Sequence, residues 1–395
     1  MLPGMKRLEC FDGLRGLLAM YVLLGHMAPF AVLPDRLQDL LSHGGAAVDV
    51  FFVLSGLVIT QSLLHTGGQL KPFLIARATR IFPVFLVVFA LAVAVEPWSC
   101  GFDHMPWIDD DNAARTICVM AWPHYWLPEL AAHLTMTHGL FPNAVLKDVW
   151  VSFLGSAWSL STEWQFYLLA LGVIGGLRQA GRLRRRQGGT ALALHPHALC
   201  WMLLMLAVAG VVWSLAAPLD WQFSRAFLPN KAHFFALGVA SVAVVRQEAG
   251  AHWRYAAVLM TSLIICATHE TLGKILPPLV WTACLAIQLL PHRRGTADIG
   301  WVLRNPAARY LGAISYCLYL VNEPIHKLIV AALSFVADAD AMLFTVLWVP
   351  ASVGLPVLAS IWLHVRIEAP ALQWGRSAAR RLTVERGSRP RVSAI

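Results

Sequence analysis

Arg15 and His26 lie within one long apolar segment, residues 11–30. They are eleven positions apart, so an α-helix with about 100° per residue would place them on nearly the same face. At 1.5 Å per residue their positions would differ by roughly 16 Å along the axis. A segment of this length can cross a bilayer, where an arginine or a histidine is costly and usually functional. The spacing predicts a cation and a titratable imidazole at two depths of one membrane helix.

The other candidate residues fall into two groups by their expected depth. The inner group comprises Arg15, Arg77, Arg80 and Glu368, and the outer group comprises His26, Asp49, Glu163 and Asn322. Arginine suits phosphate because its planar guanidinium forms paired hydrogen bonds. Histidine suits removal of a proton from a hydroxyl, and an acidic neighbour can hold its tautomer. The residue types therefore predict anion binding at the inner side and hydroxyl chemistry toward the outer side.

The elements that must position these groups are membrane helices. Of the 395 residues, 58% are hydrophobic and 13% are charged, whereas soluble domains have about 25% charged residues. The mean hydropathy is +0.61. This composition excludes a soluble enzyme and predicts an all-α polytopic membrane protein. Ten spans are expected, at residues 11–32, 46–65, 73–97, 153–176, 193–217, 226–246, 253–270, 274–291, 307–333 and 341–366.

The distribution of Lys and Arg predicts the orientation of the chain. If both termini are cytoplasmic, 23 of the 31 Lys and Arg residues face the cytoplasm and seven face outward. Cytoplasmic loops normally carry such an excess. The net charge of +9 therefore reflects topology, and no nucleic-acid partner is expected. The predicted domains are a membrane domain at 8–376, with an outward loop at 98–152, and a basic cytoplasmic tail at 377–395.

The outward loop is rich in tryptophan, which suits packing against sugar or lipid and equally suits anchoring at the membrane interface. Its tryptophans are Trp98, Trp107, Trp122, Trp126 and Trp150. Cys100 and Cys118 share this loop, so a disulfide is open in an oxidising compartment. The loop histidines His104, His124, His133 and His138 are expected to be exposed. The seven cysteines have no metal-ligand spacing, and no metal site is predicted.

The candidate residues also have purely structural interpretations. A histidine within a membrane span often joins two helices by a hydrogen bond. Arg77 and Arg80, three residues apart on one helix face, suit inner-surface anchors as well as ligands. Glu323 fits the end of a helical turn before Pro324. Glu163 is harder to explain structurally, because a carboxylate within a span needs a partner.

Six segments in order resemble the membrane-bound acyltransferase family 3. They are LRGLLAMYVLLGHM, GGAAVDVFFVLSGLVIT, ARATRIFPVF, WSLSTEWQFYLL, SYCLYLVNEP and VRIEAPALQWGR, and they cover roughly residues 8–376. The resemblance implies an integral membrane O-acyltransferase. Such proteins typically move an acyl group, most often acetyl, from cytoplasmic acyl-CoA to a hydroxyl of a carbohydrate or lipid-linked glycan.

The resemblance carries the family's functional residues onto this chain. Its arginine and histidine match Arg15 and His26, its membrane-embedded glutamate matches Glu163, and its inner arginine matches Arg80. The chain departs from the pattern at Asn322, where many members have histidine. It also has a tryptophan directly after the glutamate, where a second acid is common. The asparagine can orient a substrate but cannot act as a general base.

These considerations give a complete set of expected roles. His26, Glu163 and Asp49 are assigned to catalysis, and Arg15, Arg77, Arg80, Trp158 and Asn322 to substrate binding. No permanently bound cofactor is expected, because acyl-CoA acts as donor substrate with its phosphates on the arginines. His26 deprotonates the acceptor or briefly carries the acyl group, and Glu163 or Asp49 orients it. The expected location is the inner membrane of a bacterium, in contact with membrane lipids.

Two other functions are compatible with the same residues. Arg15, His26 and Glu163 would also suit the proton or solute relay of a multi-span transporter. A non-catalytic scaffold for glycan assembly would account for the tryptophan-rich loop. For the enzyme, the acceptor stays open among exopolysaccharide, O-antigen, a periplasmic glucan and a glycosylated small molecule.

Overall fold

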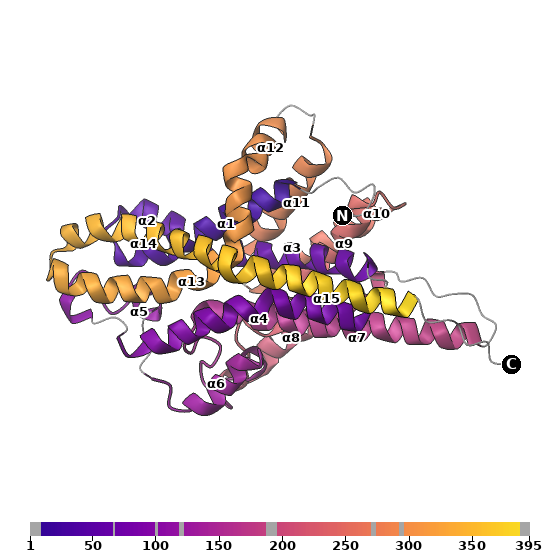
Figure 1. The fold of residues 1–395 in the computed structure, drawn as a ribbon, viewed down its shortest axis with the longest axis horizontal. Helices are drawn as coiled ribbons and strands as arrows, with labels where there is room; N and C mark the ends of the chain where they lie inside the picture. Colours follow the sequence, from indigo (N-terminus) through magenta and orange to yellow (C-terminus); the bar gives the residue numbers. More distant parts are fainter. Residues whose placement is uncertain are drawn as a thin grey trace.

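The computed structural model describes residues 9–65, 68–98, 102–117, 122–186, 196–269, 274–291 and 296–387. This part of the chain is built from helices and contains no strand (Figure 1). A single isolated bridge joins Pro142 and Phe223. The predicted all-α class is therefore confirmed. Cys100 and Cys118, for which the sequence left a disulfide open, lie outside the described residues.

Each expected span corresponds to a helix. These helices are α1 (Glu9–Met27), α3 (Gly44–His65), α4 (Leu70–Val95), α7 (Trp158–Arg186), α8 (His197–Ala216), α9 (Leu228–Val245), α10 (Ala251–His269), α11 (Leu276–Leu289), α13 (Pro306–Ala337) and α14 (Ala341–Leu363). The remaining helices are α2 (Asp35–Leu41), α5 (Ala113–Ile117), α6 (Trp126–Leu134), α12 (Thr296–Arg304) and α15 (Ala369–Gly387). Short 3₁₀ turns fill several of the connections.

Within the described ranges, seven helical segments are long and apolar enough to cross a membrane. Five of them correspond to the single helices α1, α4, α8, α9 and α13. The other two span more than one helix: one joins α2 to α3, and one starts at α14 and continues into α15. The helices α7 and α10 do not meet this criterion, and α11 has only 14 residues. The count of ten spans and the cytoplasmic placement of both termini therefore stay predictions.

The last expected span continues well beyond residue 366. After α14 the chain passes through a π turn at His364–Glu368 and enters α15. Figure 1 shows α15 as a long yellow helix lying along α4, and the two helices are in contact. Glu368, expected at the inner surface, is fully buried by this packing. Residues 377–387 are thus helical, and residues 388–395 lie outside the described part.

The helices α1 and α13 pack unusually closely because glycines meet backbone at their contact. A methyl group on Gly16 would lie 2.3 Å from the carbonyl oxygen of Ala308, and one on Gly312 would lie 1.9 Å from that of Asp12. Small residues permit this approach between membrane helices. The contact brings the face of α1 that carries the arginine and the histidine directly against α13.

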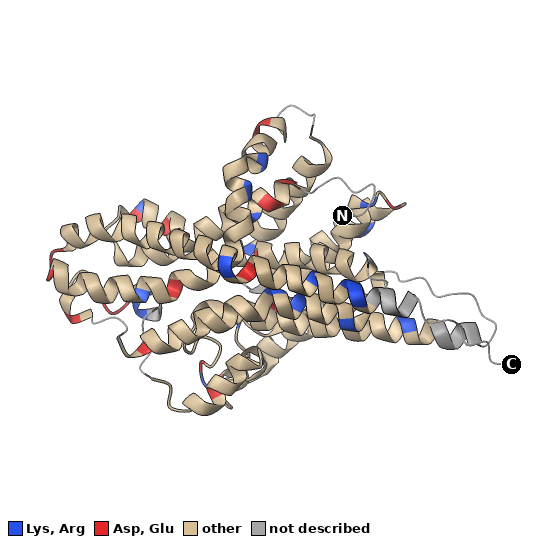
Figure 2. Ribbon diagram, viewed as in Figure 1, with Lys and Arg blue, Asp and Glu red and all other residues tan. Residues whose placement is uncertain are grey.

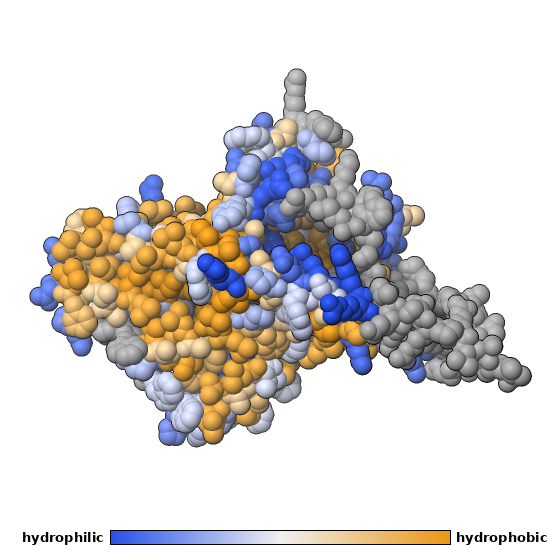
Figure 3. Space-filling view, in the orientation of Figure 1, coloured by the Kyte–Doolittle hydropathy of each residue, from blue (hydrophilic) through white to orange (hydrophobic). Residues whose placement is uncertain are grey.

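The molecular surface has the character expected of a protein in lipid. Charged residues are sparse along the helices in Figure 2. In Figure 3, apolar residues cover most of the visible face over α4, α13 and α14, whereas hydrophilic residues gather over α12 and α15. Large apolar side chains, including Trp201, Phe335 and Trp362, are more than half exposed. The chain is therefore an integral membrane protein.

Candidate active site

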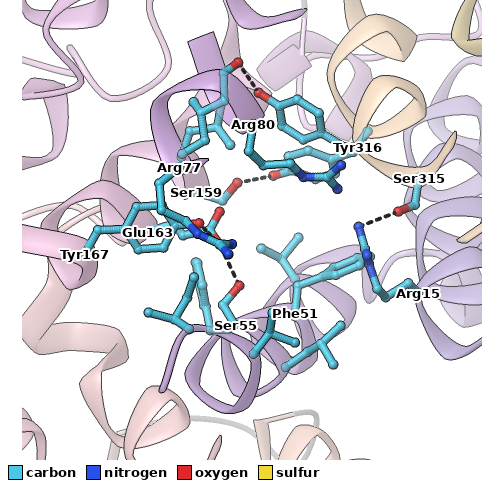
Figure 4. A pocket seen from close by; sticks show the side chains of 18 residues that line it. Arg15, Phe51, Ser55, Arg77, Arg80, Ser159, Glu163, Tyr167, Ser315 and Tyr316 are labelled. Carbon is cyan, nitrogen blue, oxygen red and sulfur yellow. Dashed lines mark hydrogen bonds between the residues drawn. The ribbon is translucent and has the colours of Figure 1, made fainter. Parts of the chain in front are cut away.

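An inner cavity of about 170 Å³ lies between α1, α3, α4, α7 and α13. Figure 4 shows the side chains of Arg15, Arg77 and Arg80 reaching it from different directions. Three of the predicted substrate-binding residues therefore line one cavity. They come from two helices, α1 and α4, that are separated in the sequence by α2 and α3.

Two of these arginines donate hydrogen bonds to hydroxyl groups. Nη2 of Arg15 donates to Oγ of Ser315 at 3.2 Å, and Nη2 of Arg77 donates to Oγ of Ser62 at 3.3 Å. The guanidinium of Arg77 also lies 6.0 Å from the centre of the Tyr167 ring. A hydroxyl does not neutralise a guanidinium, and the carboxylate that lines the same cavity belongs to Glu163.

The third arginine is part of a buried ion pair. Nη1 of Arg80 donates to Oε1 of Glu368, and the guanidinium lies 5.1 Å from the centre of the Tyr316 ring. The other carboxylate oxygen of Glu368 accepts from Nδ1 of His364 at 2.8 Å and from the thiol of Cys317. Arg80 therefore joins α4 to the π turn and faces the inner cavity at the same time.

Cys317, His364 and Glu368 bring three potential metal ligands within 4.8 Å of one another. The sequence contains no signal for this cluster, because Cys317 is 47 positions before His364. The carboxylate that a metal would need already binds the guanidinium of Arg80, whose charge opposes a second cation. The cluster is better explained as a hydrogen-bonded support for the ion pair.

Glu163 lies in the inner cavity and not beside His26. Its Oε1 accepts hydrogen bonds from the hydroxyl groups of Ser55 and Tyr167, both at 2.7 Å. Its predicted place in the outer group is therefore wrong. The reason is that α7 begins at Trp158, after a 3₁₀ turn, so Glu163 is more than one helical turn inside the bundle.

An outer cavity of about 760 Å³ contains His26 in its lining. Nδ1 of His26 lies 2.6 Å from Oδ1 of Asn322. The amide nitrogen of Asn322 donates to the carbonyl oxygens of Leu318 and Tyr319, at 2.9 and 2.7 Å. The structure thus pairs two predicted site residues that are 296 positions apart in the sequence.

The contacts of Asn322 determine which nitrogen of His26 carries the proton. Its amide group donates to two carbonyls, so its oxygen is the atom that faces the imidazole and can only accept. Nδ1 of His26 must therefore be the donor, and in the neutral imidazole Nε2 is the nitrogen that has the lone pair. The sequence led us to expect that an acidic neighbour holds the tautomer of His26, whereas in the structure Asn322 holds it.

Asp49 does not contact His26. Its Oδ1 lies 2.7 Å from Nζ of Lys231, and both side chains are buried. The pair links α3 to the first turn of α9. The prediction that Asp49 orients the histidine is therefore wrong, because its carboxylate pairs with a lysine. The spacing of the two residues in the sequence could not indicate this pairing.

Trp158 and Trp150 form an aromatic wall of the outer cavity. The guanidinium of Arg225 lies 5.0 Å from the centre of the Trp150 ring and 5.8 Å from that of Trp158. Apolar faces beside hydrogen-bond donors suit a sugar ring. Of the tryptophans in the outward loop, Trp150 is the one that lines this cavity, while Trp122 is exposed and packs on Phe153.

Glu323 is a residue whose role the sequence did not indicate. Its two carboxylate oxygens accept from the backbone N–H groups of Gly155 and Ser156, at 3.0 and 2.8 Å. Its Oε1 also lies 3.7 Å from Nζ of Lys327, which forms a buried ion pair with Glu96 at 3.0 Å. Glu323 therefore anchors the turn that precedes α7 and does not merely end a helical turn before Pro324.

His133 and His138, expected to be exposed, are fully buried. Their rings stack with centroids 4.1 Å apart, and Nε2 of His138 lies 3.1 Å from the carbonyl oxygen of Ala157. Burial lowers the pKa of His138 to about 4 and lowers the pKa of His133 well below its usual value. The pair is therefore neutral and supports the start of α7 from within the outward loop.

The inner and outer cavities are neighbours. Val48 and Tyr319 line both of them. The hydroxyl of Ser159 donates to the hydroxyl oxygen of Tyr319 at 3.0 Å, which holds the tyrosine in place. A linear molecule bound by the inner arginines would reach His26 by passing Val48 and Tyr319.

A family model described as "Acyltransferase domain" matches residues 8–365. The chain is 25% identical over 398 aligned positions to "Acyltransferase MdmB" of Streptomyces mycarofaciens, an alignment that covers 94% of this chain and 93% of the relative. No solved structure shows significant similarity to this chain.

Two further relatives match less than half of the chain. One is an "O-acetyl transferase" of Shigella phage Sf6, 26% identical over 42% of this chain and 45% of the relative. The other is "Peptidoglycan O-acetyltransferase OatA" of Listeria monocytogenes, 32% identical over 42% of this chain and 24% of the relative.

Proposed function

This chain belongs to the family described as "Acyltransferase domain", and from that premise we propose that it transfers an acyl group, expected to be acetyl, from acyl-CoA to a hydroxyl of a carbohydrate. The observation that carries the proposal is the pairing of His26 with Asn322, which leaves Nε2 of the imidazole as a base at a large outer cavity. The names of the two O-acetyltransferase relatives support acetyl as the group that is moved.

The inner cavity suits the donor. CoA carries several phosphates, and Arg15 and Arg77 offer guanidinium groups whose side-chain hydrogen bonds go to hydroxyls. Arg80 adds a third guanidinium, although its charge is offset by Glu368. We infer that the phosphates bind on this side and that the pantetheine arm extends past Tyr319 toward His26.

The outer cavity suits the acceptor. Its volume of about 760 Å³ exceeds that of the inner cavity several times, and Trp150 and Trp158 offer flat apolar surfaces for a sugar. One relative is named as a peptidoglycan O-acetyltransferase, which supports a carbohydrate acceptor here.

The chemical step follows from the tautomer of His26. Nε2 accepts the proton of the acceptor hydroxyl while that oxygen attacks the thioester carbonyl. The resulting tetrahedral intermediate collapses by breaking the carbon–sulfur bond, and the imidazolium returns its proton to the CoA thiolate. Asn322 stabilises the imidazolium by accepting from Nδ1–H throughout. The products are an ester and free CoA, and no acyl-histidine is required.

The proposed site of action is the inner membrane of a bacterium, with the donor reached from the cytoplasm. The apolar surface and the excess of Lys and Arg at the expected cytoplasmic side support this arrangement. Membership of an acyltransferase family favours the enzyme over the transporter and the scaffold, for which the same intramembrane residues would serve.

The test is acyl transfer by membrane vesicles that are loaded with a host glycan fraction and supplied with radiolabelled acetyl-CoA. We expect label in an alkali-labile glycan product with the wild type and with His252→Ala, a substitution of an exposed histidine on α10. His26→Ala should give no product while its thermal stability stays near that of the wild type.

Full activity of the His26→Ala variant would overturn the catalytic assignment. Accumulation of an intact solute inside the vesicles, without release of CoA, would instead support the transporter. Label that appears in lipid and not in glycan would overturn the carbohydrate acceptor while leaving O-acyl transfer in place.

A further inference from the structure

Acyl transfer places a negative charge on the carbonyl oxygen of the thioester when the acceptor oxygen attacks the carbonyl carbon. Enzymes stabilise that charge with a hydrogen-bond donor, and loss of one such donor typically lowers kcat about a hundredfold to a thousandfold. His26 and Asn322 manage the proton of the acceptor, and their hydrogen bond to each other does not provide this donor. Another group beside the path from the inner cavity to His26 must supply it.

Two backbone N–H groups at the outer cavity would suit this task but are already used. Gly155 and Ser156 are neighbours in the 3₁₀ turn before α7, and both line the outer cavity. Their N–H groups donate to the carboxylate oxygens of Glu323 at 3.0 and 2.8 Å. The hydroxyl oxygen of Ser156 has no hydrogen-bond partner, but it also has almost no accessible surface from which to reach a substrate. This turn therefore supports the cavity wall and leaves the oxyanion to another donor.

The hydroxyl group of Tyr319 is a donor whose proton is available. Its oxygen accepts from the hydroxyl of Ser159 at 3.0 Å, so its own O–H points elsewhere. The hydroxyl of Ser159 lies farther, at 3.4 Å, from the carbonyl oxygen of Ser156, so the bond to Tyr319 is the better one. Within the described part of the chain, no group accepts from the tyrosine O–H. Ser159 belongs to the first turn of α7 and reaches the inner cavity (Figure 4), so α7 holds the phenol in place.

Tyr319 also lies where the thioester has to pass. It lines the inner cavity together with the arginines and the outer cavity together with His26. It precedes Asn322 by three residues on α13, and the amide nitrogen of Asn322 donates to its backbone carbonyl oxygen at 2.7 Å. Residues three apart share a helix face, so the phenol and the group that holds His26 project from one side of α13. Val48 lines both cavities as well, but its side chain has no donor.

On the basis of the acyl transfer proposed above, we propose that Tyr319 is a further catalytic residue, whose O–H donates to the carbonyl oxygen of the thioester. As the acceptor oxygen bonds to the carbonyl carbon, His26 takes the acceptor's proton and the π electrons of the carbonyl move onto its oxygen. Tyr319 stabilises this charge and keeps its own proton. When the carbon–sulfur bond breaks, the carbonyl re-forms and the imidazolium protonates the CoA thiolate. Phe51 packs 6.5 Å from the phenol, measured between ring centres, and apolar surroundings strengthen such a hydrogen bond.

The test compares initial rates of CoA release by the full chain in vesicles, with acetyl-CoA and the host glycan fraction, for the wild type, Tyr319→Phe and Tyr255→Phe. Phenylalanine keeps the ring and removes only the hydroxyl. Tyr255 is a matched control because it is equally buried, its hydroxyl lies 2.8 Å from that of Thr282, and it lines neither cavity. We expect Tyr319→Phe to lower kcat about a hundredfold to a thousandfold with a nearly unchanged KM for acetyl-CoA, and Tyr255→Phe to keep the wild-type rate.

Ser159→Ala separates a catalytic hydrogen bond from a structural one. Without Ser159 the phenol O–H can rotate, so kcat should fall about tenfold when Tyr319 is present. The same substitution should have no further effect in Tyr319→Phe, because no hydroxyl is left to hold. A merely structural role of Ser159 would lower the rate by the same factor in both backgrounds.

A loss of kcat in Tyr319→Phe but not in Tyr255→Phe, together with no added effect of Ser159→Ala, supports the proposal. Full activity of Tyr319→Phe, or a comparable loss with Ser156→Ala in its place, would overturn it and leave acyl transfer intact. A lower thermal stability of Tyr319→Phe with an unchanged kcat would assign the hydroxyl to folding alone. If the wild type itself releases no CoA, the proposed function fails, and the role of Tyr319 fails with it.

Discussion

The carboxamide oxygen of Asn322 lies 2.6 Å from Nδ1 of His26, and the amide nitrogen of the same asparagine donates to two backbone carbonyls of α13. The asparagine is thus held in one orientation by its own helix. Because α1 and α13 pack through glycines, the imidazole on α1 cannot move far from this acceptor.

Asn322→Leu should lower kcat by a factor on the order of 10³ and leave the KM for acyl-CoA nearly unchanged. Leucine has a similar size but cannot accept from Nδ1–H, so the imidazole loses its fixed tautomer. Loss of the tautomer costs serine proteases a factor on the order of 10⁴, where the partner is a carboxylate and not a neutral amide. Initial rates of CoA release measure both constants. Asn322→Asp, which restores an acceptor, should recover part of the rate, and a kcat for Asn322→Leu within twofold of the wild type would refute the role.

Arg77→Gln should raise the KM for acyl-CoA about tenfold to a hundredfold with little change in kcat. The guanidinium lines the inner cavity and would lose a charge-assisted hydrogen bond to phosphate, which contributes about 1.5–3 kcal/mol. Kinetics at varied acyl-CoA concentration check this. The matched control is Arg254→Gln, which alters an exposed arginine of α10. An unchanged KM would place the CoA phosphates elsewhere.

Arg80→Met should destabilise the protein by about 3–5 kcal/mol, because it leaves the buried carboxylate of Glu368 without its cation. The double variant Arg80→Met/Glu368→Leu should regain most of that stability, since no unpaired charge remains. Thermal unfolding in detergent measures both. If the double variant is no more stable than Arg80→Met, the ion pair is not the reason for the loss.

Stability should fall as the pH is lowered from about 7 toward 4. The pKa of His138 is lowered to about 4 and that of His133 is lowered further by burial, so the unfolded chain, with histidine pKa values near 6.5, binds protons first. The stability that the two neutral histidines contribute is complete above about pH 6.5 and is lost progressively as the pH falls below this value. The raised pKa of buried Glu129 acts in the opposite sense, because the folded protein binds that proton more readily than the unfolded chain does.

Unfolding midpoints between pH 7.5 and 4.5, compared for the wild type and His138→Asn, check this prediction. The variant should start with a lower midpoint and show a shallower dependence on pH, because it has lost one of the two groups that titrate. A pH dependence as steep as that of the wild type would mean that other groups are responsible.

Much of the architecture follows from local sequence alone. Hydropathy over windows of about 20 residues predicts where helices form, and each expected span is indeed a helix. Helix periodicity also places Arg15 and His26 on one face of α1, and the three-residue spacing of Arg77 and Arg80 places both at the inner cavity. These are properties of a single helix, which is why they can be read before the helices are packed.

Contacts between helices were decided by tertiary structure. Asn322 meets His26, Asp49 meets Lys231 and Glu368 meets Arg80 because of packing between segments that are far apart in the sequence. The depth expected from the sequence was wrong for Glu163, because that depth depends on where α7 begins. The turn before α7 is held by Glu323, which lies far away in the sequence. Residue types and helix periods thus determine which chemistry is available, whereas the packing of helices, on which local sequence carries no information, decides which groups meet.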